Sequence, residues 1–546
     1  MHGSIERRRR TSLGGWVVGG ALLALAAGAH AQVPAKVVES LGAPATLSTG
    51  LGKLEFKDGV PTAESAQKTY DILDFSHALS AYNNSFRGAS ALALVKGFES
   101  IGAKPGDVVI FPKLMDAHSL FLTANADTVY YLTGLDLSKG PIVVEQPPGA
   151  VGTINDMWFS WIIDIGGPGP DRGLGGKYLI VGPDYKGPLP EGGYFIGRSR
   201  TNLALYAARA YLVNNDPAPA VEVIKKTMKV YPYLPGSFGT SLAQALEGTV
   251  RIAGEPKIPE TKFIEASGKS FNTIPPSDVG FFELINENVQ REPATSYDIE
   301  LAGQLAAIGI VRGKPFKPDA RMQKILSDAA AFGQATGRAL NWRYAMKHPG
   351  WAYYPGSQWG SMLWEGGAFF ETPPPLFEAG MFKPLPPTGA RTLDSRTAFY
   401  YGYTLDSPGM IMRAPGVGSQ YLMAFADAEG NPFDGARTYR VVLPPKIPAE
   451  AFWSFTVYDN QTRSMLQTPQ NYPRAGSQGY PSPAAQASAD GSTTIWFGPT
   501  QPAGVARGNW VQTAPGKGWF TILRLYSPLP SFFDKSWRVG EIEPVK

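Results

Sequence analysis

The feature of this sequence that most constrains its fold is a proline-rich connector at residues 371–389, ETPPPLFEAGMFKPLPPTG. Proline lacks the backbone N–H that helices and sheet ladders need, so closely spaced prolines keep a helix or a central strand from crossing this segment. The connector is therefore the best predicted domain boundary. Residues 390–546 are expected to form a separate domain.

The C-terminal segment consists of aromatic and β-branched runs separated by turn residues, which is the pattern of short strands. Six or more strands with almost no helix predict an antiparallel β-sandwich, or jelly roll. A long loop between Asp459 and Asp490 has the character of a lid or a binding loop. The predicted strands are TAFYYGYTL, SQYLMAFAD, RTYRVVLPP, AFWSFTVYD, STTIWFGP and GWFTILRLYSP.

Residues 62–217 predict an α+β N-terminal domain that is rich in strands. Thr62 can cap a helix that continues to about Tyr82, and a second helical run covers residues 89–101. From Asp107 onward, strand patterns alternate with turn residues. The predicted strands are DVVIF, DTVYYLTGLDL, PIVVEQ, INDMWFSWIIDIG, KYLIVGP and GYFIG.

Residues 218–370 predict a mainly helical segment. Its clearest helices are 296–310 and 319–346, where apolar residues recur at spacings of three and four. Residues 32–61 are expected to form a leader before the first domain. Together these segments predict an α+β multidomain protein with a β-rich N-terminal part, a helical middle and a C-terminal β-sandwich.

Residues 1–31 have the composition of an export signal peptide. Four arginines precede an apolar run, and the segment ends in the small-residue cleavage motif Ala29-His30-Ala31. A retained membrane anchor is the alternative, although so short and glycine-rich a stretch spans a bilayer poorly. We therefore expect a periplasmic or secreted protein that has no membrane association after cleavage.

The remaining chain is almost neutral. The signal peptide carries four of the 50 basic residues and one of the 46 acidic residues, so its removal leaves 46 basic and 45 acidic side chains. This balance lacks the basic surface of a nucleic-acid-binding protein. The chain has no cysteine, which excludes disulfides and thiolate chemistry. We predict no nucleic-acid partner and leave a homo-oligomer open.

Familiar catalytic motifs are missing from the sequence, since neither HExxH nor GxSxG occurs. Three histidines follow the signal peptide, namely His77, His118 and His348, and no short-range spacing connects them. We therefore predict no cofactor and no metal. A divalent metal bound by these histidines and Asp116 is the alternative.

Two polar residues, Asn125 and Asp127, stand directly before a strand pattern in the run FLTANADTVYYLTGLDL. Side chains of one parity share a strand face, which would place Asp127 on the face of Tyr131, where an ionised carboxylate needs partners. Asp127 is therefore a candidate catalytic acid or base. The alternative is that Asn125 and Asp127 form Asx turns that start the strand.

The neighbouring run INDMWFSWIIDIG is expected to form one continuous strand, on which Asp156, Trp158 and Asp164 share an open face. Its two acids would lie roughly 26 Å apart at about 3.3 Å per residue, too far to act as a pair. Asp127 could instead pair from an adjacent strand with one of them or with Asp171. Glycosidases separate their two carboxyl groups by about 5 to 9.5 Å.

Aromatic and cationic side chains supply candidate substrate contacts. Trp158 and Trp453 have the flat faces that bury sugar rings. Arg463 follows a turn, and Arg524 interrupts the apolar alternation of the last strand, where an arginine needs a carboxylate or a ligand anion. A structural salt bridge is the alternative for these arginines. The predicted substrate-binding residues are Asn125, Tyr130, Trp158, Trp453, Tyr458, Arg463 and Arg524.

Five longer segments are distinctive enough to suggest a family: NADTVYYLTGLDLSKGPIVVEQPP, NDMWFSWIIDIGGPGPDRGLGGKYLIVGPDY, GVGSQYLMAFADAEGNPFDG, AFWSFTVYDNQTRSMLQT and ADGSTTIWFGP. In this order they resemble bacterial two-part proteins with domain of unknown function 1254 followed by domain of unknown function 1214. The resemblance implies an α+β N-terminal part and a C-terminal jelly roll, similar in architecture to domains of glycan-processing enzymes. It implies no activity and no catalytic residue.

Two classes of function stay open. The first is an exported, hydrolase-like enzyme that acts on a glycan or another small polar substrate in an interdomain cleft. Its acid and base groups would come from four carboxylates: Asp127, Asp156, Asp164 and Asp171. The second is a non-catalytic periplasmic binding or assembly protein in which these acids are structural.

Overall fold

The computed structural model describes residues 33–361, 376–378, 381–383, 393–411 and 413–545. The predicted signal peptide and most of the proline-rich connector lie outside the described residues. Within the connector, β15 (Leu376–Glu378) pairs antiparallel with β16 (Met381–Lys383). The chain divides into one compact unit that ends at Tyr70 and a second that runs from Asp71 to the C-terminus, and each is described by itself.

The first unit contains a short helix and a small antiparallel sheet. Helix α1 (Ala35–Leu41) precedes β1 (Thr46–Thr49), β2 (Gly52–Lys57) and β3 (Val60–Pro61), which pair in this order. Thr62 then caps the next helix, because its Oγ1 accepts a hydrogen bond from Ser65 N at 3.2 Å. The predicted helix start at Thr62 is confirmed.

One uninterrupted helix, α2 (Ala63–Ser100), takes the place of the two predicted helices. The residues between the two predicted helices, 83–88, include polar side chains and a glycine, but this part of α2 is packed into the protein. Phe86 is buried, and Gly88 lies so close to Trp158 that a Cβ at Gly88 would be 2.6 Å from the indole ring. Tertiary packing therefore outweighs the low helix propensity of these residues.

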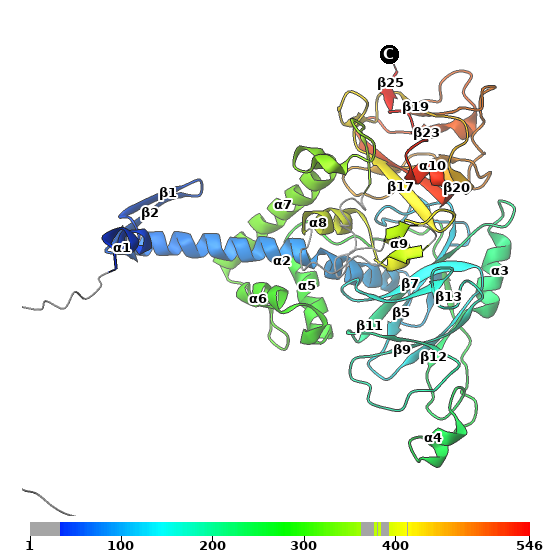
Figure 1. Ribbon diagram of the computed structural model, residues 1–546, viewed down its shortest axis with the longest axis horizontal. Helices are drawn as coiled ribbons and strands as arrows, with labels where there is room; N and C mark the ends of the chain where they lie inside the picture. The colour runs from blue at the N-terminus through cyan, green and yellow to red at the C-terminus, as the bar shows by residue number, and fades with distance from the viewer. Residues whose placement is uncertain (1–32, 362–375, 379–380, 384–392, 412, 546) are drawn as a thin grey trace, which may run out of the picture. The chain divides into compact units, whose positions relative to one another are not determined.

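The N-terminal half of the second unit contains two β-sheets (Figure 1). The six-stranded sheet has the order β13-β4-β5-β11-β7-β8, and the four-stranded sheet has the order β10-β9-β6-β12. The strands are β4 (Val108–Ile110), β5 (Val129–Asp136), β6 (Ile142–Gln146), β7 (Ala150–Asp156), β8 (Trp161–Gly166), β9 (Gly176–Val181), β10 (Phe195–Arg198), β11 (Leu203–Ala210), β12 (Lys229–Pro232) and β13 (Phe263–Glu265).

The prediction of one continuous strand through INDMWFSWIIDIG is wrong. Strands β7 and β8 form an antiparallel hairpin, with Asn155 paired to Trp161. The turn is closed by Asp156, whose Oδ1 accepts hydrogen bonds from Trp158 N at 2.8 Å and Ser160 N at 2.9 Å. The expected faces are reversed as well, since Trp158 is fully buried and Trp161 is 41% exposed.

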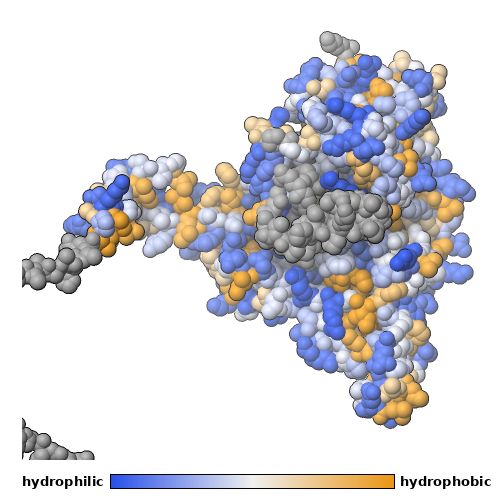
Figure 2. All heavy atoms as spheres, viewed as in Figure 1, coloured by the Kyte–Doolittle hydropathy of each residue, from blue (hydrophilic) through white to orange (hydrophobic). Residues whose placement is uncertain are grey.

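The described residues 218–361 contain five α-helices, joined by short strands and irregular segments. Asp319 caps α7 by accepting a hydrogen bond from Met322 N at 2.8 Å. Exposed leucines mark the short helix α4, where Figure 2 shows hydrophobic residues gathered on the surface. Across the part of the chain that the structure describes, no helix is both long and apolar enough to span a membrane. The helices are α3 (Ala218–Thr227), α4 (Leu242–Leu246), α5 (Gly280–Arg291), α6 (Ile299–Ala307) and α7 (Ala320–Trp342).

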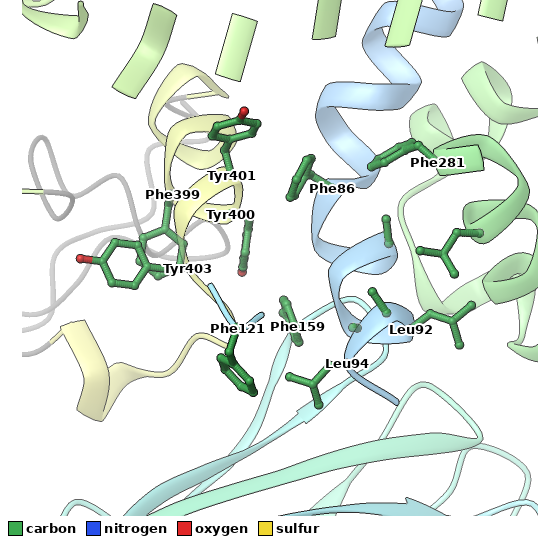
Figure 3. Packing of buried hydrophobic residues seen from close by; sticks show 14 of the residues in the cluster. Phe86, Leu92, Leu94, Phe121, Phe159, Phe281, Phe399, Tyr400, Tyr401 and Tyr403 are labelled. Atoms are coloured by element: carbon green, nitrogen blue, oxygen red, sulfur yellow. The ribbon is translucent and has the colours of Figure 1, made fainter. Parts of the chain in front are cut away.

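The predicted strand TAFYYGYTL is also wrong, because this segment belongs largely to helix α8 (Leu393–Gly402). Its aromatic residues favour strands in isolation, but they are buried against other helices. Tyr401 donates a hydrogen bond to Gln334 Oε1 on α7 at 2.8 Å, and its ring centroid lies 5.6 Å from that of Phe86 on α2. Figure 3 shows Tyr400 and Tyr401 on the side of α8 that faces α2, whereas Phe399 lies on the other side.

Two further sheets form the C-terminal part. One has the order β14-β17-β24-β20-β21 with β18 also paired to β24, and the other has the order β23-β22-β19-β25. All of their pairings are antiparallel except β22 with β23. The strands are β14 (Trp359–Gly360), β17 (Ser419–Ala424), β18 (Phe433–Asp434), β19 (Tyr439–Leu443), β20 (Ala449–Asp459), β21 (Arg474–Gly476), β22 (Thr493–Gly498), β23 (Trp510–Gln512), β24 (Gly518–Pro528) and β25 (Glu543–Pro544).

Side chains of both C-terminal sheets share one hydrophobic cluster. Phe455 of β20 and Phe497 of β22 have ring centroids 5.7 Å apart. Five of the predicted C-terminal strands are confirmed as β17, β19, β20, β22 and β24. The protein is therefore a mixed α+β protein with several sheets, of which the C-terminal ones are mostly antiparallel.

Candidate functional site

A cavity of about 140 Å³ is lined by residues from two different sheets. Strands β5, β7 and β11 contribute from the N-terminal six-stranded sheet, and β17 and β24 contribute from a C-terminal sheet. The segment before β5 and the residues that follow α8 complete the wall. The cavity therefore requires both halves of the second unit.

Much of the cavity wall is apolar. Phe121 and Leu132 contribute from the N-terminal half, and Leu405 and Met410 contribute from the segment after α8. Such a lining removes the apolar part of a small molecule from water.

Two arginines, Arg209 on β11 and Arg524 on β24, form the cationic part of the lining. Arg209 Nη2 donates to Ser419 Oγ at 3.1 Å, and Arg524 Nη2 donates to the Thr123 carbonyl at 2.9 Å. Arg209 Nη1 and both Nε and Nη1 of Arg524 are buried and have no hydrogen-bond partner among the described residues. A buried donor without an acceptor is costly, so these groups are suited to a ligand that supplies acceptors.

The residues that line the cavity include no aspartate or glutamate in the described part of the chain. The two guanidinium groups therefore face the cavity without a carboxylate in its wall. Arginine binds carboxylates and phosphates through parallel N–H donors, so the site is suited to an anion.

Tyr130 and Tyr421 add phenol groups to the lining. Asn125 Nδ2 donates to Tyr130 Oη at 3.2 Å, and Ser419 Oγ donates to Tyr421 Oη at 3.0 Å. Burial raises the pKa of Tyr130. For Tyr421, burial also acts to raise the pKa, but the positive charges of Arg209 and Arg524 outweigh it and the pKa is lowered.

Asp127 is completely buried and is not among the residues that line the cavity. Its Oδ1 lies 2.6 Å from Arg474 Nε, while its Oδ2 accepts hydrogen bonds from Ser454 Oγ at 2.7 Å and from Tyr526 Oη at 3.0 Å. Burial alone would raise the pKa of Asp127, but Arg474 and Arg524 together with these hydrogen bonds lower it. The contacts favour the structural interpretation of this carboxylate.

Asn125 forms an Asx turn in the segment just before β5. Its Oδ1 accepts hydrogen bonds from Asp127 N at 3.1 Å and from Thr128 Oγ1 at 3.3 Å. The predicted Asx turn at Asn125 is confirmed. The same side chain lines the cavity and donates to Tyr130, so the turn also positions a cavity group.

Asp156 and Asp171 have structural contacts. Besides closing the β7–β8 turn, Asp156 accepts two hydrogen bonds from Arg200 at 3.0 and 3.1 Å, and burial raises its pKa. Asp171 accepts a hydrogen bond from Tyr178 Oη at 2.6 Å and another from Gly175 N at 3.1 Å. The structure does not bring either carboxylate into the cavity lining.

Asp164 is the predicted acid whose contacts reach the cavity wall. Its Oδ2 accepts a hydrogen bond from Gly409 N at 3.0 Å, and Gly409 lines the cavity. Its Oδ1 is buried and has no hydrogen-bond partner among the described residues. Burial raises the pKa of Asp164 to about 6.

Four predicted substrate-binding residues are not part of the cavity lining, and their side chains contact other parts of the protein. Trp158 donates to Ser296 Oγ at 3.1 Å, and Trp453 belongs to the cluster between the C-terminal sheets. Tyr458 Oη donates to the Ala124 carbonyl at 2.6 Å, and Arg463 Nε donates to the Tyr401 carbonyl at 3.2 Å. Of the predicted residues, Asn125, Tyr130 and Arg524 are the ones that line the cavity.

Sequence reasoning missed Arg209, Ser419, Tyr421 and Arg474. A usable signal existed for Arg209, which interrupts the apolar run LALYAARAYL in the same way as Arg524 interrupts its own strand. Nothing in the local sequence marks Ser419, Tyr421 or Arg474. Each of these three side chains is positioned by strand pairing or by a contact with a residue that is distant in the sequence.

The histidines do not form a metal site with other ligands in the structure. His118 Nδ1 lies 2.9 Å from Asp116 Oδ1, and His348 Nε2 lies 3.0 Å from Asp394 Oδ2. Within the described ranges, no group of three or more His, Cys, Asp or Glu side chains is arranged to hold a metal ion.

Comparison with protein families gives two matches. Residues 105–232 match "Protein of unknown function (DUF1254)", and residues 418–530 match "Protein of unknown function (DUF1214)". The chain carries both domains of unknown function, in this order. Tyr130 and Arg209 lie in the DUF1254 region, and Tyr421 and Arg524 lie in the DUF1214 region, so each region supplies one arginine and one tyrosine of the lining.

Two solved structures are similar to this DUF1254–DUF1214 chain. The VPA0106 protein from Vibrio parahaemolyticus has 17% identity and a TM-score of 0.47, over 87% of this chain and 100% of that chain. An uncharacterized protein from Burkholderia cenocepacia has 12% identity and a TM-score of 0.34, over 89% of this chain and 99% of that chain. Neither protein is described by an activity. No curated protein matches the sequence.

Proposed function

We propose that the cavity binds a small organic anion, with a carboxylate or similar group at the arginines and an apolar body against the opposite wall. The observation that carries this proposal is the pair Arg209 and Arg524, which keep unpaired N–H groups at a cavity whose described lining has no acid. An anionic group would supply the missing acceptors. The apolar wall would bury the rest of the molecule.

The protein would then be a non-catalytic binding protein, and its ligands would be small organic anions. We further propose that binding takes place in the periplasm or outside the cell, because residues 1–31 have the composition of an export signal. The shared hydrophobic cluster of the two C-terminal sheets supports a jelly roll as the finer description of that part.

A hydrolase-like enzyme is the second candidate, and Asp164 is the observation in its favour. A carboxyl group with a pKa of about 6 is suited to acid–base chemistry near neutral pH, and Asp164 is bonded to the cavity wall. The paired-carboxylate mechanism gains no support from Asp127, Asp156 or Asp171, since each is held by structural contacts. Trp158 and Trp453 do not support a glycan substrate either, because both side chains are buried and cannot contact a sugar ring.

The test is a comparison of small carboxylates with their neutral amides by calorimetry on the purified chain. Phenylacetate, benzoate and hexanoate are suitable probes, each with its amide as the matched uncharged molecule. We expect the carboxylates to bind at least about tenfold more tightly than the amides, since hydrogen bonds to charged groups contribute about 1.5–3 kcal/mol.

The matched variants are Arg209→Gln at the cavity and Arg440→Gln on β19, whose side chain is half exposed. Arg209→Gln should weaken carboxylate binding by about 10- to 100-fold, and Arg440→Gln should leave it unchanged. The proposal is overturned if no carboxylate of the panel binds, if the amides bind equally well, or if Arg209→Gln binds like the unmodified protein.

A further inference from the structure

Tyr421 occupies a special position in the cavity, between its two arginines. It pairs with Arg524 across strands β17 and β24, and the Arg524 guanidinium lies 5.2 Å from the centre of its ring. On the other side, Arg209 donates to Ser419 Oγ, and Ser419 in turn donates to Tyr421 Oη. The phenol oxygen therefore accepts a hydrogen bond from a serine that is itself polarised by a guanidinium.

Positive charge is in excess around this phenol. The titratable groups that interact electrostatically with Tyr421 are Tyr130, Tyr403, Tyr526, Arg209 and Arg524. Burial raises the pKa of Tyr130, Tyr403 and Tyr526, so these phenols stay neutral near neutral pH and the arginines set the sign of the local potential. Asp127, a carboxylate that acts on Arg524 and Tyr526, is already paired with Arg474.

The two arginines lower the pKa of Tyr421 although burial acts to raise it. An organic anion in the cavity would place its charge near the same guanidinium groups. Two negative charges at one cationic site oppose each other, so the occupied cavity favours the neutral phenol. Ligand binding and the ionisation of Tyr421 are then linked.

We propose that Tyr421 is a specificity-determining residue that, once it has ionised, carries the negative charge of the empty cavity and takes up one proton when an anionic ligand binds. The proton comes from the solvent, the phenol O–H bond forms, and the ligand replaces the phenolate as the counterion of Arg209 and Arg524. This inference rests on the proposed function. It predicts that the cavity selects a ligand group with a single negative charge.

The first test is a tyrosinate absorbance titration of the ligand-free protein. The chain has 24 tyrosines, so the signal of one residue is obtained as the difference between the unmodified protein and Tyr421→Phe. We expect this difference to show one tyrosine that ionises clearly below the usual pKa of about 10. The control Tyr70→Phe, which removes an exposed tyrosine outside the cavity lining, should keep that early ionisation.

A second variant keeps the inference testable if Tyr421→Phe fails to fold. Ser419→Ala removes the hydrogen bond to Tyr421 Oη and leaves the phenol in place. It should move the early ionisation to higher pH. An unmodified protein without an early-ionising tyrosine, or a Tyr421→Phe protein that still has one, contradicts the inference.

The second test measures proton uptake when phenylacetate binds, by calorimetry in buffers of different ionisation enthalpy. On the alkaline side of the early ionisation, the unmodified protein and Tyr70→Phe should take up close to one proton per ligand, and affinity should fall by up to about tenfold per pH unit. Tyr421→Phe should bind without uptake. Binding without uptake in the unmodified protein contradicts this inference alone, whereas no carboxylate binding at any pH overturns the proposed function.

Discussion

Arg474 and Asp127 form an ion pair in which neither side chain is exposed, with Arg474 Nε 2.6 Å from Asp127 Oδ1. Asp127 lies in the DUF1254 region and Arg474 in the DUF1214 region, so this pair joins the two regions inside the protein. Ser454 and Tyr526 satisfy the second carboxylate oxygen. Each partner of such a buried pair depends on the other, because either charge alone would be left without compensation.

The variant Asp127→Asn should therefore be destabilised by about 3–5 kcal/mol, since it leaves the Arg474 guanidinium buried and unpaired. Urea unfolding measures this change, with the exposed Asp328→Asn on α7 as the control that should unfold like the unmodified protein. A catalytic role for Asp127 makes the opposite prediction. Normal stability of Asp127→Asn would restore that role.

Packing between helices α7 and α8 predicts opposite effects for two glycine substitutions. A Cβ at Gly337 would lie 2.4 Å from the Tyr401 ring, so Gly337→Ala should lose roughly 1–3 kcal/mol through overpacking. Gly303 on α6 is helical too and has nothing within 4 Å of its added Cβ, so Gly303→Ala should gain up to about 1 kcal/mol. Thermal unfolding of both variants distinguishes them, and equal shifts would disprove the close packing at Tyr401.

The raised pKa of Asp164 predicts a definite pH dependence of stability. Because its folded-state pKa of about 6 lies above the usual value of about 3.9, the native protein binds this proton more tightly than the unfolded chain. The unmodified protein should lose stability from this group as pH rises from about 4 to about 6.

The variant Asp164→Asn has no titrating carboxyl group at this position, so its stability should not fall for this reason as the pH rises. Its stability relative to the unmodified protein should increase by on the order of 2–3 kcal/mol between pH 4 and 7. Urea unfolding at several pH values provides the measurement. A difference that stays constant across this range would mean that Asp164 is not perturbed by burial.

Chelator treatment should leave the thermal unfolding temperature unchanged. Among the described residues, His118 pairs with Asp116 and His348 pairs with Asp394, and no group of three possible ligands is arranged to hold a divalent ion. Metal analysis of the purified protein is the direct check. A stoichiometric metal whose removal lowers the unfolding temperature would support the three-histidine alternative.

The sequence predicts the strands of this fold better than their connections. Segments with plain alternation, such as β19, are placed correctly because one face of the strand is buried and the other is exposed. The β7–β8 hairpin is missed because its turn is stabilised by one aspartate side chain and contains Phe159 at a φ of 52°. Helix α8 is missed because its aromatic residues are held by contacts with distant helices.

The site is predictable only in part for the same reason. The Asx turn at Asn125 is a local feature, and the arginine at position 524 stands out in its own strand. The partner of Asp127 lies 347 residues along the chain, and no local pattern connects the two. Tyr421 becomes notable only when strand pairing places it beside Arg524.

Strand β24 gives this architecture a strict dependence on register. Arg524 and Tyr526 lie on one face, toward the cavity and Asp127, while Leu523 and Leu525 lie on the other, in the cluster of the C-terminal sheets. The insertion of a single codon early in this strand would exchange the two faces. Leucines would then meet the Asp127 carboxylate and a guanidinium would enter the apolar cluster, so such an insertion would be as damaging as a deletion of the whole strand.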